Sequence, residues 1–307
     1  MTLHHFTSPR WLVRAGGWRS AETPALFAEY ASRMLRRLGD RVEWVCTINE
    51  ANTPLQLTAN GLLSDELIAA MNASFAAAAP AFGAAPDGFG VFFTATDEAS
   101  LGVIAEAHRQ AVAAVHAARG NAKAGITLSL QQAASEAGGE PQAEAFDEAV
   151  NRRFLRELGA VGDFVGVQNY SRLRFGPEGL LPRTENVTGA GLELVPSSLA
   201  DTCRQAHELT QLPVLVTEHG ADLDDSQDHR RVAFIEESLR ELAATIADGV
   251  DVRGYLHWSL MDNWEWFKGY QGCFGLLGND RTTQRRSIRP SAALLGSIAR
   301  ANAVASR

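Results

Sequence analysis

The sequence has few cysteines, no long apolar run and no excess of positive charge. Its three cysteines, Cys46, Cys203 and Cys273, lie far apart and form no Cys-x-x-Cys pair. Because an odd number cannot pair off completely within one chain, we expect free thiols in a reducing compartment. No run approaches the ~18–20 apolar residues that cross a bilayer. The net charge of −8 disfavours a nucleic-acid partner, which selects for basic surfaces.

Targeting, metal and phosphate motifs are also missing. The first residues, MTLHHFTSPRW, contain no basic segment followed by a long apolar stretch, as a secretory signal would. With the expected free thiols, this indicates a cytoplasmic location and no membrane partner. No spaced cluster of His, Cys and Asp predicts a metal site, and no glycine-rich loop follows a strand to hold phosphate. We therefore expect no metal and no cofactor.

The hydrophobic pattern predicts an α/β fold in one domain spanning residues 1–307. Short β-rich runs alternate with longer segments of helical period, which indicates βα units around a parallel sheet. Strands are predicted near residues 2–6, 42–47, 124–130, 162–168, 213–217 and 252–258. Helices are predicted near residues 22–38, 99–119, 144–158, 198–211, 228–247 and 290–303. Residues 74–97 and 172–197, rich in turn-forming residues, are predicted to be loops.

Two glutamates stand at the ends of strand-like runs. Glu50 closes the sequence T-I-N-E, and Glu218 lies in T-E-H-G. Catalytic side chains gather at the carboxyl ends of strands in a parallel barrel. Retaining glycoside hydrolysis needs two such carboxyl groups ~5–5.5 Å apart. Alone, each glutamate is more often a surface residue or a helix cap.

An aromatic segment follows the last predicted strand. Residues 255–266, YLHWSLMDNWEW, combine three Trp with Asp262, Asn263 and Glu265. Flat indoles beside a few fixed polar groups suit a sugar, whose C–H faces stack while its hydroxyls form hydrogen bonds. An aromatic core plug would explain one or two of these Trp, but not the interleaved polar residues.

Five stretches in the same order resemble glycoside hydrolase family 1, the β-glucosidase and β-galactosidase family. They are TLHHFTSPRW, WVCTINEAN, DFVGVQNYSR, VLVTEHG and YLHWSLMDNWEWFKGYQGCFGL. The resemblance implies a (β/α)8 TIM-barrel-like fold and a double-displacement mechanism. It makes Glu50 the acid/base catalyst and Glu218 the nucleophile.

The resemblance also implies the substrate-binding residues. Asn49 would bind the 2-hydroxyl of the sugar, His5 its 3-hydroxyl, and Tyr170 would hold the nucleophile. Trp258 would be the sugar platform, Glu265 and Trp266 would read the 3-, 4- and 6-hydroxyls, and Phe274 would line the same subsite. Gln168 stands where many members have Asn and keeps the amide on a longer arm. Ala51 replaces a Pro of the family, and His219 an Asn.

These roles make physical demands on the side chains. Glu218 must be ionised to attack, which a hydrogen bond from Tyr170 favours. Glu50 must start protonated, so burial and the nearby carboxylate should raise its pKa. Glu265 would repel a phosphate, which favours unphosphorylated β-glucosides or β-galactosides. Lys268 is expected to be a solvated loop charge.

The chain also resembles an incomplete barrel of about six βα units. Family members place two βα units before the T-L-x-H-W strand, whereas here Met1 directly precedes it. A Gln and an Arg of the family's site would go with those units. The strands near 2–6 and 252–258 would be exposed edges, so we expect a homo-oligomer that covers them; a gapped monomer is the alternative.

The leading interpretation is thus an active retaining β-glycosidase. The alternatives are a sugar-binding pseudoglycosidase with little turnover and a fragment of a longer product.

Overall fold

The computed structural model describes residues 1–38, 41–61, 63–84, 90–266 and 268–305. The chain forms two compact units. The first contains Met1–Ser129, Glu148–Gly166 and Leu209–Leu212, and the second contains Leu130–Asp147, Val167–Glu208 and Pro213–Arg307.

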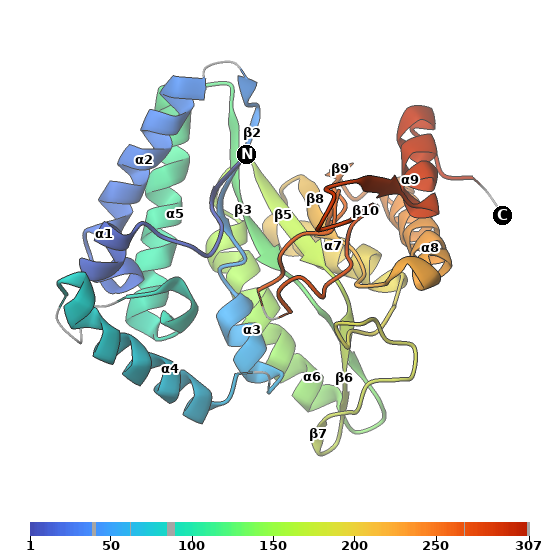
Figure 1. The fold of residues 1–307 in the computed structure, drawn as a ribbon, viewed down its shortest axis with the longest axis horizontal. Coiled ribbons are helices and arrows are strands. Elements are labelled where there is room, and N and C mark those ends of the chain that lie inside the picture. Colours follow the sequence, from blue (N-terminus) through green and yellow to red (C-terminus); the bar gives the residue numbers. More distant parts are fainter. Residues whose placement is uncertain (39–40, 62, 85–89, 267, 306–307) are drawn as a thin grey trace. The chain divides into compact units, whose positions relative to one another are not determined.

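In the first unit, parallel strands pack beside a pair of long helices (Figure 1). Its strands are β1 (Thr2–His4), β2 (Trp44–Asn49), β3 (Lys123–Ser129) and the first half of β5 (Phe164–Asn169). Strand β1 pairs in parallel with β2, and β2 with β3. The helices are α1 (Arg10–Arg14), α2 (Thr23–Leu38), α3 (Thr53–Ala59), α4 (Asp65–Ala78) and α5 (Glu98–Ala118), and α2 lies alongside α5.

Helix α5 follows from its sequence. Asp97 caps its N-terminus by accepting a hydrogen bond from the Ser100 N–H at 3.0 Å. Its buried side chains recur at helical spacing, among them Ile104, His108 and Val115. His108 is fully buried: its Nδ1 lies 2.8 Å from Thr47 Oγ1 on β2, and its Nε2 faces the carbonyls of Leu158 and Val161. This histidine is therefore part of the core.

The second unit continues the parallel pattern and adds two small antiparallel or mixed sheets. The rest of β5, β8 (Val214–His219) and β9 (Val252–Tyr255) are its parallel strands, with β8 paired to β9. Strands β4 (Gln132–Ser135), β6 (Arg172–Gly176) and β7 (Gly179–Leu180) form one small sheet, and β10 (Leu277–Asn279) and β11 (Arg286–Ile288) form a hairpin. Its helices are α6 (Glu140–Asp147), α7 (Ser197–Thr210), α8 (Asp228–Ala247) and α9 (Pro290–Ala301).

The six predicted strands are all present, as β1, β2, β3, β5, β8 and β9. Among the described strands of each unit, β1 pairs with β2 alone and β9 pairs with β8 alone. Five predicted helices are α2, α5, α7, α8 and α9. The sixth, near 144–158, is α6 followed by two π-helical segments, Glu148–Arg152 and Leu155–Gly159.

The two loop predictions are partly wrong. Helix α4 continues to Ala78, so the segment 74–97 begins as helix; its alanines, read as loop composition, are strong helix formers. Residues 85–89 of that prediction lie outside the described residues. Strands β6 and β7 lie within 172–197, where Gly and Pro obscured them. The β6 strand is stabilised by its pairing with β4, which is distant in sequence.

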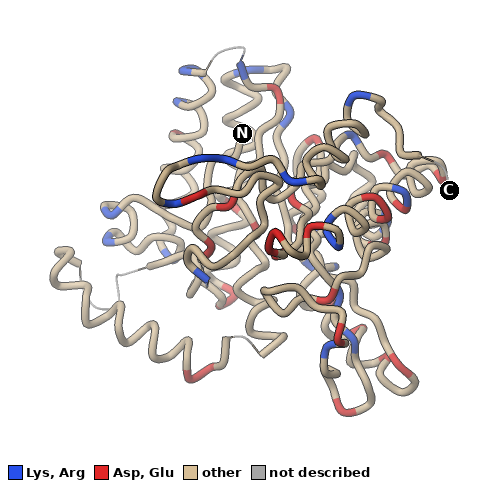
Figure 2. Tube along the Cα trace, turned by 45° about the vertical axis from the view of Figure 1, so that its right-hand side comes forward, with Lys and Arg blue, Asp and Glu red and all other residues tan. Residues whose placement is uncertain are grey.

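Charged residues of both signs follow one another along the helices (Figure 2). Several form pairs one turn apart, such as Arg33 with Glu29 and Arg240 with Glu236. No described helix is long and apolar enough to cross a membrane.

Candidate active site

Glu218 lies at the carboxyl end of β8, where Tyr170 holds it. The Tyr170 hydroxyl donates a hydrogen bond to Glu218 Oε2 at 2.5 Å, and Glu218 is 9% exposed. Tyr170 directly follows β5, and the ring of buried Phe274 meets it edge-on, with centroids 6.1 Å apart. A hydroxyl donor stabilises the ionised carboxylate. The expected contact between Tyr170 and Glu218 is therefore present.

The backbone beyond Glu218 is packed tightly against the end of β9. The Trp258 N–H donates to the His219 carbonyl at 3.0 Å, and a Cβ on Gly220 would lie 1.9 Å from the Trp258 carbonyl oxygen. The His219 ring is buried, stacks on Phe234, and has its Nδ1 2.8 Å from the Tyr255 hydroxyl. Burial holds the pKa of His219 well below its usual value, so the ring is neutral. His219 thus helps to align the strand ends that carry Glu218 and Trp258.

Trp258 and Glu265 also contact one another. The Trp258 indole N–H donates to Glu265 Oε1 at 3.2 Å. Burial raises the pKa of Glu265, and the charges of Asp222 and Asp262 add to that rise. Trp266 and Trp264 meet edge-to-face with centroids 5.5 Å apart, and both are more than 40% exposed. An amphipathic surface of this kind can stack a sugar and hydrogen-bond its hydroxyls.

Glu50 belongs to the first unit and has a different environment. It follows β2 with a φ of +50°, and its N–H donates to the Thr127 carbonyl at 2.8 Å. A non-glycine residue adopts this left-handed conformation at a cost of about 1–3 kcal/mol. Burial raises the pKa of Glu50 to about 7, against the opposing effect of a 2.9 Å hydrogen bond from Thr53 Oγ1. Glu50 can therefore carry a proton near neutral pH.

The loop around Glu50 is anchored by buried amides. Asn52 donates to the carbonyls of Ser129 and Val150 and accepts from the Ser129 N–H, and Gln56 on α3 also contacts Ser129. Sequence reasoning missed these residues and Thr53, although the Thr-Pro pair that opens α3 is a recognisable helix start. Their effect is to fix the chain directly after Glu50.

The remaining predicted site residues also lie near strand ends. Asn49 is the last residue of β2 and is 2% exposed, and His5 directly follows β1. Gln168 is buried in β5, two positions before Tyr170. His5, Asn49 and Glu50 belong to the first unit, and the other seven belong to the second.

The chain matches a known family over nearly its whole length. Residues 1–172 and 181–304 match the sequence profile described as Glycosyl hydrolase family 1. The chain belongs to glycosyl hydrolase family 1.

Individual relatives agree with this assignment. The chain is 30% identical over 322 residues to a beta-glucosidase of Agrobacterium sp. (strain ATCC 21400), covering 94% of this chain and 69% of the relative. It is 29% identical to thermostable beta-glucosidase B of Thermobispora bispora, covering 98% of this chain and 68% of that protein.

The fold agrees as well. The crystal structure of beta-glycosidase BGL167 superposes with a TM-score of 0.90 at 39% identity, covering 100% of this chain and 73% of that one. The apo structure of beta-glucosidase 1317 gives 0.88 at 37% identity, covering 98% and 73%. The predicted α/β, TIM-barrel-like fold, incomplete in this chain, is confirmed. As a family 1 member, the protein is a glycoside hydrolase.

Two polar residues of the family 1 aromatic segment, Asp262 and Asn263, have structural roles. The Asp262 carboxylate accepts hydrogen bonds from the Arg289 guanidinium at 2.7 and 3.0 Å and from the Gly275 N–H at 2.8 Å. The Asn263 amide donates to Ser259 Oγ and the Met261 carbonyl. Asp262 therefore joins the segment to Gly275 and Arg289, and Asn263 holds the segment's own backbone, because buried polar groups need partners.

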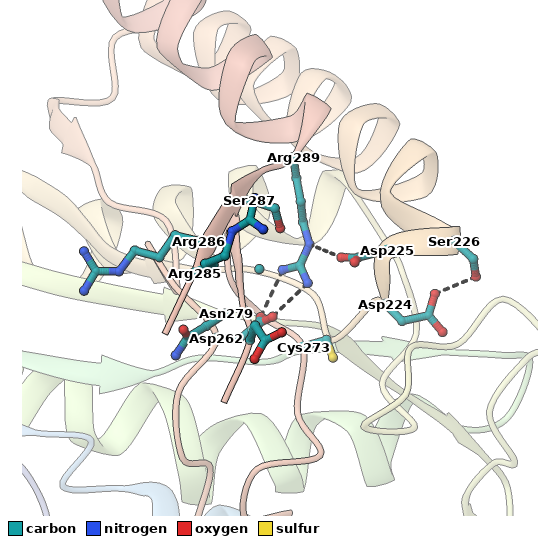
Figure 3. A pocket seen from close by; sticks show the side chains of 12 residues that line it. Asp224, Asp225, Ser226, Asp262, Cys273, Asn279, Arg285, Arg286, Ser287 and Arg289 are labelled. Carbon is teal, nitrogen blue, oxygen red and sulfur yellow. Dashed lines mark hydrogen bonds and ion pairs between the residues drawn. The ribbon is translucent and has the colours of Figure 1, made fainter. Parts of the chain in front are cut away.

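Arg289 and Asp262 border a cavity of about 640 Å³ in the second unit (Figure 3). Arg289 also pairs with Asp225 at 2.7 Å. Asp224, Asp280, Arg285 and Arg286 add charges of both signs to the wall. None of the predicted site residues lines this cavity, so it is separate from the residues that bear the expected chemistry.

The prediction that Lys268 is a solvated loop charge is wrong. Its Nζ donates to Asp222 Oδ2 and to the Gly189 carbonyl, each at 2.7 Å. Asp222 is buried, and a buried carboxyl group needs polar partners to replace the water it has lost. Sequence pattern alone does not predict this pairing, since 46 positions separate the two residues.

Arg231 was likewise not recognised from the sequence. It is fully buried on α8 and donates to Asp228, to the Leu223 carbonyl and to the Cys273 carbonyl. It therefore fixes the loop that follows Glu218. The Asp-x-x-Arg spacing on one helix face was the available signal.

None of the three cysteines forms a disulfide, as expected. Among the described residues, no three His, Cys, Asp or Glu side chains are grouped as a metal ion would require. The absence of a metal and of a cofactor remains a prediction.

Proposed function

We propose that the protein is a retaining β-glycosidase with Glu218 as nucleophile and Glu50 as acid/base catalyst. The observation that carries the proposal is the contrast between the two carboxyl groups. Glu218 accepts the Tyr170 hydroxyl, which favours its ionised form, whereas burial raises the pKa of Glu50 to about 7. The two roles require one ionised and one protonated carboxyl group.

The reaction follows from these two protonation states. Glu218 attacks the anomeric carbon while Glu50 gives its proton to the leaving glycosidic oxygen, so a glycosyl ester forms and an alcohol departs. Glu50, now ionised, takes a proton from water, whose oxygen attacks the same carbon and releases Glu218. Two inversions give net retention. Retaining hydrolysis of this kind requires two carboxyl groups ~5–5.5 Å apart during turnover.

The proposed substrates are unphosphorylated β-D-glucosides and β-D-galactosides. Trp258 and Trp266 supply apolar faces, and Glu265, with Asn49, His5 and Gln168, supplies hydrogen-bonding groups for hydroxyls. A phosphate near Glu265 would meet a carboxylate, and Lys268 is already engaged by Asp222. These charges disfavour a phosphosugar.

Hydrolysis of p-nitrophenyl β-D-glucoside tests the activity, and azide rescue separates the two roles. Glu218→Gly should lose at least about 10³-fold in kcat. Azide should then restore turnover by attacking the anomeric carbon in place of the missing carboxylate. The product should be the α-glucosyl azide, because this reaction has only one inversion. Glu50→Ala with azide should yield the β-glucosyl azide. Equal turnover by wild type and Glu218→Gly without azide would refute the enzyme; sugar binding without turnover would indicate a pseudoglycosidase.

We also propose that the chain is a single cytoplasmic domain that assembles with a second copy. Among the described strands of its own unit, β1 pairs with β2 alone and β9 pairs with β8 alone, and a strand with an open edge favours association. Three cysteines that form no disulfide suit a reducing compartment. Light scattering should give a discrete dimer or higher oligomer, and a monodisperse monomer would contradict the assembly.

A further inference from the structure

A short turn in the second unit joins Glu265 to Lys268. The Glu265 N–H donates to the Gly269 carbonyl at 2.8 Å, and the Gly269 N–H donates back to the Glu265 carbonyl at 2.7 Å. The Lys268 N–H also donates to the Glu265 carbonyl, at 3.3 Å. Because these bonds close the turn, a force that holds Lys268 also holds the backbone of Glu265.

Lys268 anchors the turn to two other loops. Its ammonium contacts the carboxylate of Asp222, four residues beyond Glu218, and the carbonyl of Gly189. The second Asp222 oxygen accepts the Cys273 N–H at 2.7 Å, directly before Phe274. The side chains of Lys268 and Asp222 are 30% and 4% exposed, so the carboxylate of this ion pair is shielded from water and the lysine is partly so.

Close packing leaves the Glu265 side chain little freedom to compensate. A Cβ on Gly272 would lie 2.6 Å from Glu265 Cγ, so the side chain rests directly against that backbone. A Cβ on Gly189 would lie 2.9 Å from Asp222 Oδ2, which packs the ion pair equally closely. The Asp222 charge raises the pKa of Glu265, with burial as the larger cause. Lys268 neutralises that charge and so limits the repulsion.

We propose that Lys268 is a positioning residue for sugar specificity: through Asp222 it fixes Glu265 at the sugar and so sets the discrimination between gluco- and galacto-configured substrates. The inference rests on the proposed function, because it takes Glu265 as a residue that reads sugar hydroxyls. The two sugars differ only in the orientation of the 4-hydroxyl. A carboxylate held in one place accepts a hydrogen bond from one orientation better than from the other, and an untethered carboxylate adapts to both.

The chain offers a matched control, because it contains two lysines, Lys123 and Lys268. Lys123 is exposed at the start of β3 and belongs to the first unit. The experiment compares Lys268→Met, Lys268→Arg, Asp222→Asn and Lys123→Met. For each, kcat and KM are measured with the p-nitrophenyl β-glucoside and β-galactoside.

Lys268→Met should move the ratio of the two kcat/KM values toward one by about 10-fold. A factor of this size corresponds to part of the free energy of one charge-assisted hydrogen bond. The change should lie mostly in KM, because hydroxyl contacts act in the ground state as well. Asp222→Asn should change the ratio in the same direction, Lys268→Arg should restore it largely, and Lys123→Met should leave it unchanged. Equal losses on both sugars would overturn the proposal, as they show a merely structural role.

Two further measurements keep the test decisive. If Lys268→Met does not fold, Gly272→Ala displaces Glu265 from its other side and should change the same ratio; an unchanged ratio refutes the inference. If the wild type does not turn over, calorimetric Kd values for glucoimidazole and its galacto-configured counterpart give the same ratio. That separates failure of the proposed function from failure of the role of Lys268. A variant that loses only 6-phosphoglucoside hydrolysis would instead make Lys268 a phosphate ligand and overturn the proposal.

Discussion

Removing the Thr53 hydroxyl should shift the alkaline limit of activity upward. Thr53 Oγ1 donates to Glu50 Oε2 at 2.9 Å and lowers the pKa of Glu50, which burial has raised to about 7. Thr53→Val keeps the size and shape of the side chain but cannot donate. Because the lost hydrogen bond favours the charged carboxylate, the pKa of Glu50 should rise further.

The magnitude follows from the strength of such bonds. A hydrogen bond to a charged group contributes about 1.5–3 kcal/mol, and one pKa unit corresponds to 1.36 kcal/mol. The alkaline limb of the kcat/KM profile reports the acid catalyst of the free enzyme. We therefore expect that limb to move up by about one to two pH units in Thr53→Val.

The assay is a pH profile of kcat/KM between pH 5 and pH 10 with an alkyl β-glucoside, whose poor leaving group needs the acid. Thr58→Val is the control, because Thr58 Oγ1 donates to the Pro54 carbonyl on the same helix without contacting Glu50. Its profile should match that of the wild type. An unmoved or lowered limb in Thr53→Val would show that Glu50 is not the group that titrates there.

Three other results are expected. The pKa of Glu50 is about 7 in the folded protein against 4.5 in the unfolded chain, so the free energy of unfolding should fall as the pH rises from 4.5 to 7. Glu50→Gln removes the buried charge and should raise the free energy of unfolding by up to about 3 kcal/mol at pH 8. At pH 4 it should change nothing, and urea unfolding at the two pH values measures the difference. Tyr170→Phe removes the hydroxyl from Glu218 and should lower kcat/KM by about 10- to 100-fold; an unchanged value would contradict its role. Gly220→Ala should lower the free energy of unfolding by about 1–3 kcal/mol or more, because the new Cβ overlaps the Trp258 carbonyl. The control, Gly102→Ala, has open space on α5 and should raise the free energy of unfolding by about 0.5–1 kcal/mol. Calorimetry measures both changes.

The parallel strands were predictable because their signals are local. Each buried strand is a continuous apolar run followed by a helix of regular period, so β2, β3, β5 and β8 could be located within a few residues. The short strands β4, β6, β10 and β11 were missed. Runs of three to five residues carry too little periodicity, and their stability comes from pairing with distant partners.

The candidate site shows the same division. The strand-end positions of Glu50 and Glu218 were readable from their motifs, and so was the aromatic character of residues 255–266. The role of Lys268 was wrongly predicted and that of Asp262 was not predicted, because their partners, Asp222 and Arg289, lie 46 and 27 positions away. Residue type shows what a side chain can bind but not which partner the fold brings to it.

By itself the sequence determined the alternation of strands and helices, the family motifs and the placement of two carboxylates at strand ends, since each depends on neighbouring residues. Only the tertiary structure decided which partners and which protonation states those groups have. It brought the Tyr170 hydroxyl to Glu218 across 48 positions, buried Glu50 until its pKa reached about 7, and paired Lys268 with Asp222. Burial and contacts between distant residues arise only when the elements pack, and both determine the protonation states of the carboxyl groups.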